Sequence, residues 1–118
     1  MKIFQPRSLR EASEILMDTG TTTTGVEIMR TKSIGLAVDI GDVSSSLGNI
    51  LKQESLAVGA DAAVHELVSR CDVPKTKVVL VGTLKQLQKL AIKLQKNIVQ
   101  LSEIGKNLEI ALAVKFLP

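Results

Sequence analysis

The spacing of apolar residues divides the chain into helical and extended stretches. From Leu9 to Leu16 apolar side chains recur every three or four residues, which is the period of an amphipathic helix. Ser8 and Glu11 have the spacing of a capping box, in which each side chain binds a free backbone N–H at the helix start. Gly20 is suited to end the helix in a left-handed conformation. The pattern predicts a helix of about twelve residues.

A longer helix is predicted after residue 83, where Thr83 and Gln86 form a second capping box. The apolar residues that follow keep helical spacing: Leu84, Leu87, Leu90, Ala91, Leu94, Ile98 and Leu101. The opposite face carries the lysines Lys85, Lys89, Lys93 and Lys96. Such a stripe is typical of a solvated helix face, although it could also meet an acidic partner. A third, shorter helix is predicted to begin at an Asp61 cap and to run to Val68.

Four stretches favour strands. Ile34–Ile40 and Ser55–Val58 are rich in apolar residues next to turn-forming ones, and Lys77–Val81 has the character of a buried strand. Ile110–Phe116 alternates large apolar side chains with Ala111, Ala113 and Lys115, as in a strand with one heavy and one light face.

The segments between these elements are less regular. Residues 41–49 are rich in turn-forming side chains. The β-branched residues of Thr21–Thr24 disfavour helix and suit either a strand or a loop. Together the elements indicate an α+β (or α/β) fold with one mixed sheet and three to four helices. Without a linker or an internal repeat, residues 1–118 are expected to form a single domain.

Composition narrows the range of functions. The apolar content is 45%, but the chain has two Phe and no Trp or Tyr, so it lacks stacking platforms for single-stranded nucleic acid. The net charge of +3 is a mild bias without an Arg-rich patch, and nucleic-acid binding is not expected. No apolar run approaches the ~20 residues of a membrane span. The single Cys71 cannot form an internal disulfide, which agrees with the cytoplasm.

Residues able to carry chemistry are scarce. His65 is near Asp61 and Glu66, so a metal or acid–base role is open, but a surface histidine on a short helix is favoured. Cys71 is better interpreted as a small apolar residue than as a nucleophile. Residues 81–83 resemble a phosphate-binding turn, yet they lack the glycines and the Lys-Ser/Thr pair of a P-loop. We assign no catalytic residue and no metal site.

Four short motifs occur in order between residues 3 and 108. They are FQPRSLREA at residues 4–12, VDIGDV at 38–43, LAVGA at 56–60 followed by His65-Glu66-Leu67, and EIGKNL at 103–108. These motifs and their spacing resemble the FAD-binding domain, or medium subunit, of molybdenum hydroxylases of the xanthine dehydrogenase and carbon monoxide dehydrogenase type. The chain is similar to a shortened form of that domain.

The resemblance implies an FAD-binding component of an oxidoreductase, a flavoprotein subunit with partner subunits in a complex. Residues 1–50 resemble the first FAD subdomain, and residues 51–118 resemble the start of the second. In the family, two Gly-rich loops hold the pyrophosphate through backbone N–H groups. The matching cofactor-binding positions here are Thr23, Thr24, Gly25, Gly105, Lys106 and Asn107.

The chain departs from the family at both loops. The Thr21–Thr24 tract with Gly25 replaces an Ala-Gly-Gly-Thr-Asp loop, and Lys106 replaces a glycine. An alternative hypothesis is therefore a non-catalytic module derived from the family, which acts by self-association as a homo-oligomer or by protein binding. On that hypothesis the terminal strand Ile110–Phe116 would pair across chains, because an uncovered edge strand offers free backbone groups.

Overall fold

The computed structural model describes residues 1–70 and 72–117, so Cys71 lies outside the described residues. The described chain folds into five α-helices and one three-stranded sheet, which confirms the α+β class. The helices are α1 Leu9–Met17, α2 Thr23–Arg30, α3 Ser45–Ala57, α4 Leu84–Leu94 and α5 Val99–Lys115. The strands are β1 Gly35–Ser44, β2 Asp61–Ala63 and β3 Lys75–Thr83, and a short 3₁₀ turn spans Val68–Arg70.

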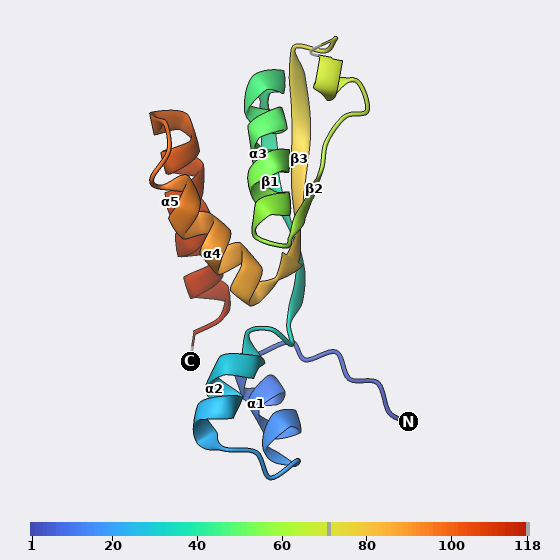
Figure 1. Ribbon diagram of the computed structural model, residues 1–118, viewed down its shortest axis with the longest axis vertical. Helices are drawn as coiled ribbons and strands as arrows, with labels where there is room; N and C mark the ends of the chain where they lie inside the picture. The colour runs from blue at the N-terminus through green and yellow to red at the C-terminus, as the bar shows by residue number, and fades with distance from the viewer. Residues whose placement is uncertain (71, 118) are drawn as a thin grey trace.

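The sheet has the order β1-β3-β2, and β3 is antiparallel to both of its neighbours. The sequence predicted a mixed sheet, but both strand pairs of the observed sheet are antiparallel. Strands β1 and β2 run in the same direction and are joined through α3, with β3 inserted between them (Figure 1). A bulge interrupts β1 between Asp39 and Gly41, where Gly41 has a φ of 89° that few residues other than glycine adopt.

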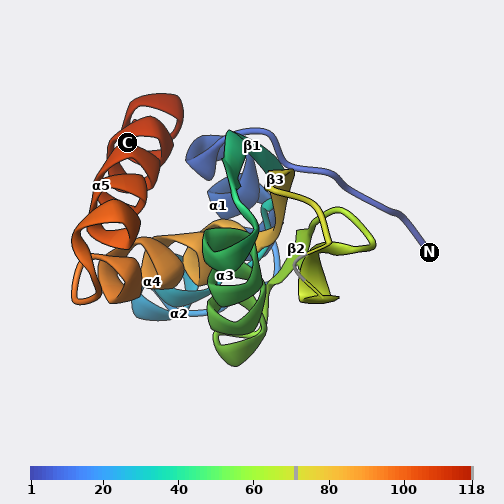
Figure 2. The ribbon, with the colours of Figure 1, turned by 90° about the horizontal axis from the view of Figure 1, so that it is seen from above.

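Helices cover one face of the sheet. Val78 and Leu80 of β3 and Ala62 of β2 are buried on this face, and α3 and α4 contact it. Helix α3 approaches β3 closely, because a Cβ added to Gly48 would lie 2.5 Å from Cγ2 of Thr76. Lys93 of α4 forms an ion pair of 2.9 Å with Glu54 of α3. The opposite face of the sheet has no helix over it among the described residues (Figure 2).

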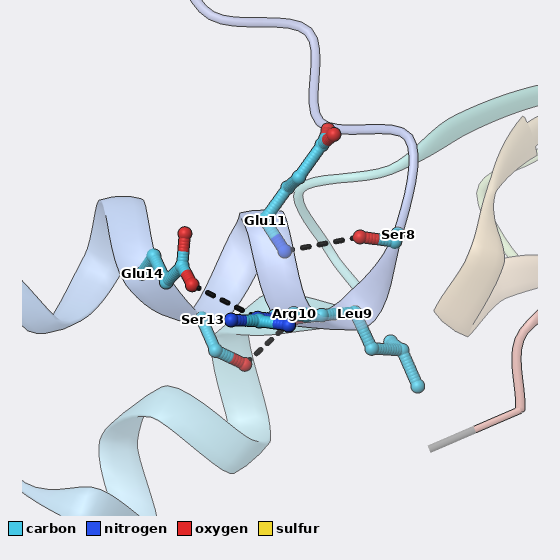
Figure 3. A network of polar contacts seen from close by, with 6 residues as sticks. All are labelled: Ser8, Leu9, Arg10, Glu11, Ser13 and Glu14. Atoms are coloured by element: carbon cyan, nitrogen blue, oxygen red, sulfur yellow. Dashed lines mark hydrogen bonds and ion pairs between the residues drawn. The ribbon is translucent and has the colours of Figure 1, made fainter.

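Helices α1 and α2 form a separate hairpin beneath the sheet in Figure 1. Ser8 caps α1 by accepting a hydrogen bond from the Glu11 N–H at 3.1 Å, as Figure 3 shows. Backbone bonds join the hairpin region to the start of α4, since the Leu84 N–H donates to the Ile34 carbonyl at 2.8 Å. Ala12 and Ile34 extend the main core into this region.

Several predicted elements are confirmed. The helix after Ser8, the strands at Ile34–Ile40 and Lys77–Val81, and the helix capped by Thr83 all occur near their predicted positions. The Thr83 capping box is complete, with both of its hydrogen bonds present. The predicted long helix is interrupted, however, because α4 ends at Leu94 and α5 begins at Val99.

Other predictions are wrong. Ser55–Val58 is not a strand, because Ser55 and Leu51 lie one turn apart on the buried face of α3. Residues 41–49 are not mainly turns, since β1 continues to Ser44 and α3 follows directly. Asp61 begins the short strand β2 rather than a helix, and its carboxylate accepts a 2.6 Å hydrogen bond from Lys52.

The predicted terminal strand is also wrong, because Ile110–Lys115 belongs to helix α5. Its alternating large side chains are also spaced four residues apart, so the pattern suits a helix as well as a strand. Leu112 and Phe116 form one such pair, and both are buried in the core. The tract Thr21–Thr24 was predicted to be a strand or a loop. Its last two residues instead form the first turn of α2, and Thr22 is the N-cap.

Candidate functional site

The first group of predicted cofactor residues lies at the start of α2. Thr23 and Thr24 are exposed in the first turn, and Gly25 follows them. The Gly25 N–H donates a 3.0 Å hydrogen bond to Oγ1 of Thr22. This amide is therefore already used to cap the helix, and the segment is a helix start rather than an open glycine loop.

The second group, Gly105, Lys106 and Asn107, lies in the middle of α5. Backbone N–H groups inside an α-helix bind carbonyls of the preceding turn, so they do not form a cradle for phosphate. Gly105 is buried where α5 crosses α4. A Cβ at this position would lie 2.6 Å from the Ala91 carbonyl oxygen and 2.9 Å from Cβ of Leu94. Helix packing therefore accounts for this glycine.

The two groups come from different parts of the molecule. Helix α2 belongs to the lower hairpin, whereas the middle of α5 lies beside α4 in the upper body (Figure 1). The residues of each group are close to one another, but the two groups do not line one common pocket.

The uncovered sheet face carries a shallow hollow of about 400 Å³, whose lining includes Asp42, His65 and Lys77. Beside it, Lys77 donates to Asp39 at 3.0 Å. This bond and a second one from the Gly41 N–H lower the pKa of Asp39, and the same carboxylate raises the pKa of Lys77.

His65 has a structural role at this hollow. The ring Nδ1 of His65 accepts a 3.1 Å hydrogen bond from the backbone N–H of Leu67. The backbone N–H of His65 donates to Oγ1 of Thr76 at 2.8 Å. His65 is exposed, as predicted, but it lies in the loop after β2 rather than on a helix. Within residues 1–70 and 72–117 no three His, Cys, Asp or Glu side chains are grouped so that they could hold a metal ion.

Helix α5 is apolar on two opposite sides. Its inner stripe packs against α4 and is buried, and it consists of Leu101, Gly105, Leu108 and Leu112. Its outer side carries Val99, Ile110 and Val114, which are 71%, 62% and 66% exposed. At 3.6 residues per turn these three side chains fall within an arc of about 60°.

Two charged residues complete this outer face. Glu103 and Lys106 come between Val99 and Ile110 in the sequence and widen the arc to about 80°, and both are exposed. Neither side chain has an ion-pair or hydrogen-bond partner in the part of the chain that the structure describes. Helix α5 lies at the left edge of the molecule in both views (Figures 1 and 2), and the exposure of these side chains leaves this face open to another molecule. We name Val99, Glu103, Lys106, Ile110 and Val114 the outer face of α5.

The sequence prediction missed this face because the last part of α5 was assigned to a strand. A usable signal was present: Val99, Glu103, Lys106 and Ile110 are separated by four, three and four residues, which is helical spacing. Among the described helices, none combines the length and the apolar character required to cross a lipid bilayer. No protein-family model, curated protein or solved structure matches this chain.

Proposed function

We propose that this protein is a non-catalytic association module that forms homo-oligomers through the outer face of α5. The observation that carries the proposal is the exposure of Val99, Ile110 and Val114 on a helix whose opposite side is already packed. A helix side that carries apolar residues normally packs against another part of the protein. The second apolar side of α5 therefore lacks a cover within the described chain.

The arrangement of exposed apolar residues supports this choice of surface. Isolated apolar side chains on a surface are ordinary, whereas groups of them mark interaction sites. On α5, Ile110 and Val114 are one helical turn apart, and Ile92 of α4 is exposed beside Ala113 at a hollow between the two helices. Both helices of the pair thus carry exposed apolar side chains.

Light scattering coupled to size-exclusion chromatography, over a series of protein concentrations, tests the proposal. The wild-type chain is expected to have the mass of an oligomer that dissociates on dilution. Ile110→Lys is expected to yield a monomer, because a lysine ammonium buried in an apolar contact loses its hydration.

The matched control is Gln53→Lys, which adds the same charge at an exposed position of α3. This variant should keep the wild-type mass. A wild-type chain that stays monomeric at all concentrations, or an oligomer that Ile110→Lys leaves unchanged, contradicts the proposal.

FAD binding, with partner subunits of an oxidoreductase, remains a prediction of the sequence resemblance. A cytoplasmic location remains a prediction of the cysteine content. The visible absorption spectrum of the protein, recorded after incubation with excess FAD and desalting, tests the flavin hypothesis. Retained flavin bands would favour the oxidoreductase hypothesis. Our association proposal predicts a spectrum without them, since α5 is a continuous helix at the second group of predicted residues.

A further inference from the structure

We infer that the partner of the outer face of α5 is the same face of a second copy, in antiparallel orientation about a two-fold axis, with Glu103 of each copy opposite Lys106 of the other. This inference rests on the proposed self-association and adds to it the orientation, the register and the residues that specify them.

The spacing of the outer face suits a helix partner. Val99, Glu103, Lys106 and Ile110 follow one another at intervals of four, three and four residues, which is the spacing of the seam in a two-helix coiled coil. Ala113, three residues after Ile110, continues the spacing and is exposed. Such a seam forms a straight ridge along one side of α5, which a second helix can follow.

Two-fold symmetry selects the antiparallel orientation. The midpoint between Glu103 and Lys106 is also the midpoint between Val99 and Ile110. An axis through this point brings Val99 of one copy to the height of Ile110 of the other. The same operation brings Glu103 to the height of Lys106, so these four positions of one copy are complementary to the same four positions of the other in both apolar and charged residues. In this register Val114 lies beyond the N-terminal end of α5 of the second copy.

The parallel orientation is disfavoured by charge. In register, it would place Glu103 opposite Glu103 and Lys106 opposite Lys106, which costs free energy at both levels. Charged or polar residues at a coiled-coil seam commonly set register and orientation in this way. Both side chains are available for the task, since neither has a partner among the described residues.

Charge reversal tests the pairing. Glu103→Lys makes the centre of the face wholly positive, and Lys106→Glu makes it wholly negative, so each variant alone should raise the dimer dissociation constant at least about tenfold. An equimolar mixture of the two variants should form a heterodimer, seen by native mass spectrometry. The double variant Glu103→Lys with Lys106→Glu should form a homodimer again.

Matched controls reverse charges elsewhere. Glu27→Lys on α2 and Lys89→Glu on α4 change exposed residues that have no ion pair among the described side chains, and both variants should dimerise like the wild type. Far-ultraviolet circular dichroism of each variant should match the wild-type spectrum, because Glu103 and Lys106 are exposed.

The outcomes separate the two proposals. A dimer that Ile110→Lys abolishes, but that keeps its affinity in both single reversals, overturns the antiparallel pairing and leaves self-association through α5 intact. Loss of the dimer in both reversals without recovery in the mixture or in the double variant also overturns the pairing. A wild-type chain that is monomeric throughout overturns self-association and the pairing together.

Discussion

Helices α4 and α5 pack against each other, yet their residue patterns differ. Helix α4 has one apolar face, whose buried residues include Leu87, Leu90 and Leu94, and an opposite face of lysines. Helix α5 has an inner apolar stripe that meets α4, and a second apolar stripe that faces outward. The first helix resembles the surface helix of a monomer, whereas the second has the pattern of a helix enclosed on two sides.

The two sides of α5 have different roles: the inner stripe contributes to folding, and the outer face is free for association. The inner stripe of α5 and the face of α4 satisfy each other within one chain, so they explain why the pair forms. The outer face of α5 adds nothing to that contact and exposes apolar side chains to water. Substitutions on the two sides of α5 should therefore change different measured quantities.

Leu101→Ala should have the largest effect on stability. Leu101 is fully buried on the inner stripe, and removing its side chain leaves a cavity against α4, at a cost of about 2–5 kcal/mol in the free energy of unfolding. Urea denaturation measures the change. The matched variant Ile110→Ala on the outer face should cost no more than about 0.5 kcal/mol when measured on the monomer. Equal losses at the two positions would contradict the assignment of inner and outer sides.

Gly105→Ala should have the next largest effect. The added methyl group would lie 2.6 Å from the Ala91 carbonyl oxygen, so the two helices must separate. We expect a loss of about 1–3 kcal/mol in the free energy of unfolding, measured by the same denaturation. The control is Gly35→Ala, where no atom lies within 4 Å of the added Cβ, and it should change stability by less than about 1 kcal/mol. An unaffected Gly105→Ala variant would contradict the close helix crossing.

The helix starts allow a sharper comparison. Thr83 caps α4 with a complete capping box, whereas Ile98 at the N-cap of α5 makes no side-chain bond. Thr83→Ala should lower the free energy of unfolding by about 1 kcal/mol. Ile98→Asp should raise it by up to about 1 kcal/mol, because the carboxylate can accept a free N–H of the first turn. Thermal unfolding of both variants checks the opposite signs, and a destabilised Ile98→Asp would count against the cap geometry.

Lowering the pH should have the smallest effect on the free energy of unfolding. The groups concerned lie in the sheet and not in α4 or α5. The pKa values of Asp39 and Asp61 are lowered by hydrogen bonds from Lys77 and Lys52, so their contribution to stability is present above the ordinary value of 3.8. This contribution to stability is lost as the pH falls from about 3.8 through the lowered pKa values of the two carboxyl groups. Both ion pairs are exposed, so the loss is small.

The raised pKa of Lys77 has the opposite sign. Its contribution is present below the ordinary value of 10.5 and is lost as pH rises through the raised pKa. Unfolding measured across the pH range should therefore be flat near neutrality. Asp39→Asn should remove most of the alkaline change and part of the acid change, and an unchanged pH profile would show that the Asp39–Lys77 pair does not stabilise the sheet.

Local signals explain the predictions that are confirmed. Ser8 and Thr83 mark helix starts through bonds to residues three positions away, and these bonds need no other part of the fold. The strands β1 and β3 follow from runs of β-branched and other apolar residues. The α+β class follows from these elements together.

The failed predictions depend on distant contacts. The apolar spacing of Ile110–Phe116 is compatible with a strand or a helix. In the structure the segment is helical, and Leu112 packs into the core beside α4. Ser55 is a polar residue buried in α3, which a short sequence window does not indicate. The predicted cofactor residues were assigned to loops, whereas Gly25 and Gly105 lie within helices.

The starts of α1 and α4 and their apolar faces follow from local sequence, because a helix start and a helix stripe depend on residues within one or two turns. Long-range packing, in contrast, places Gly105 at a helix crossing and leaves Val99, Ile110 and Val114 exposed. Burial depends on which segments meet in space, and α5 could cover only one of its two apolar sides with α4.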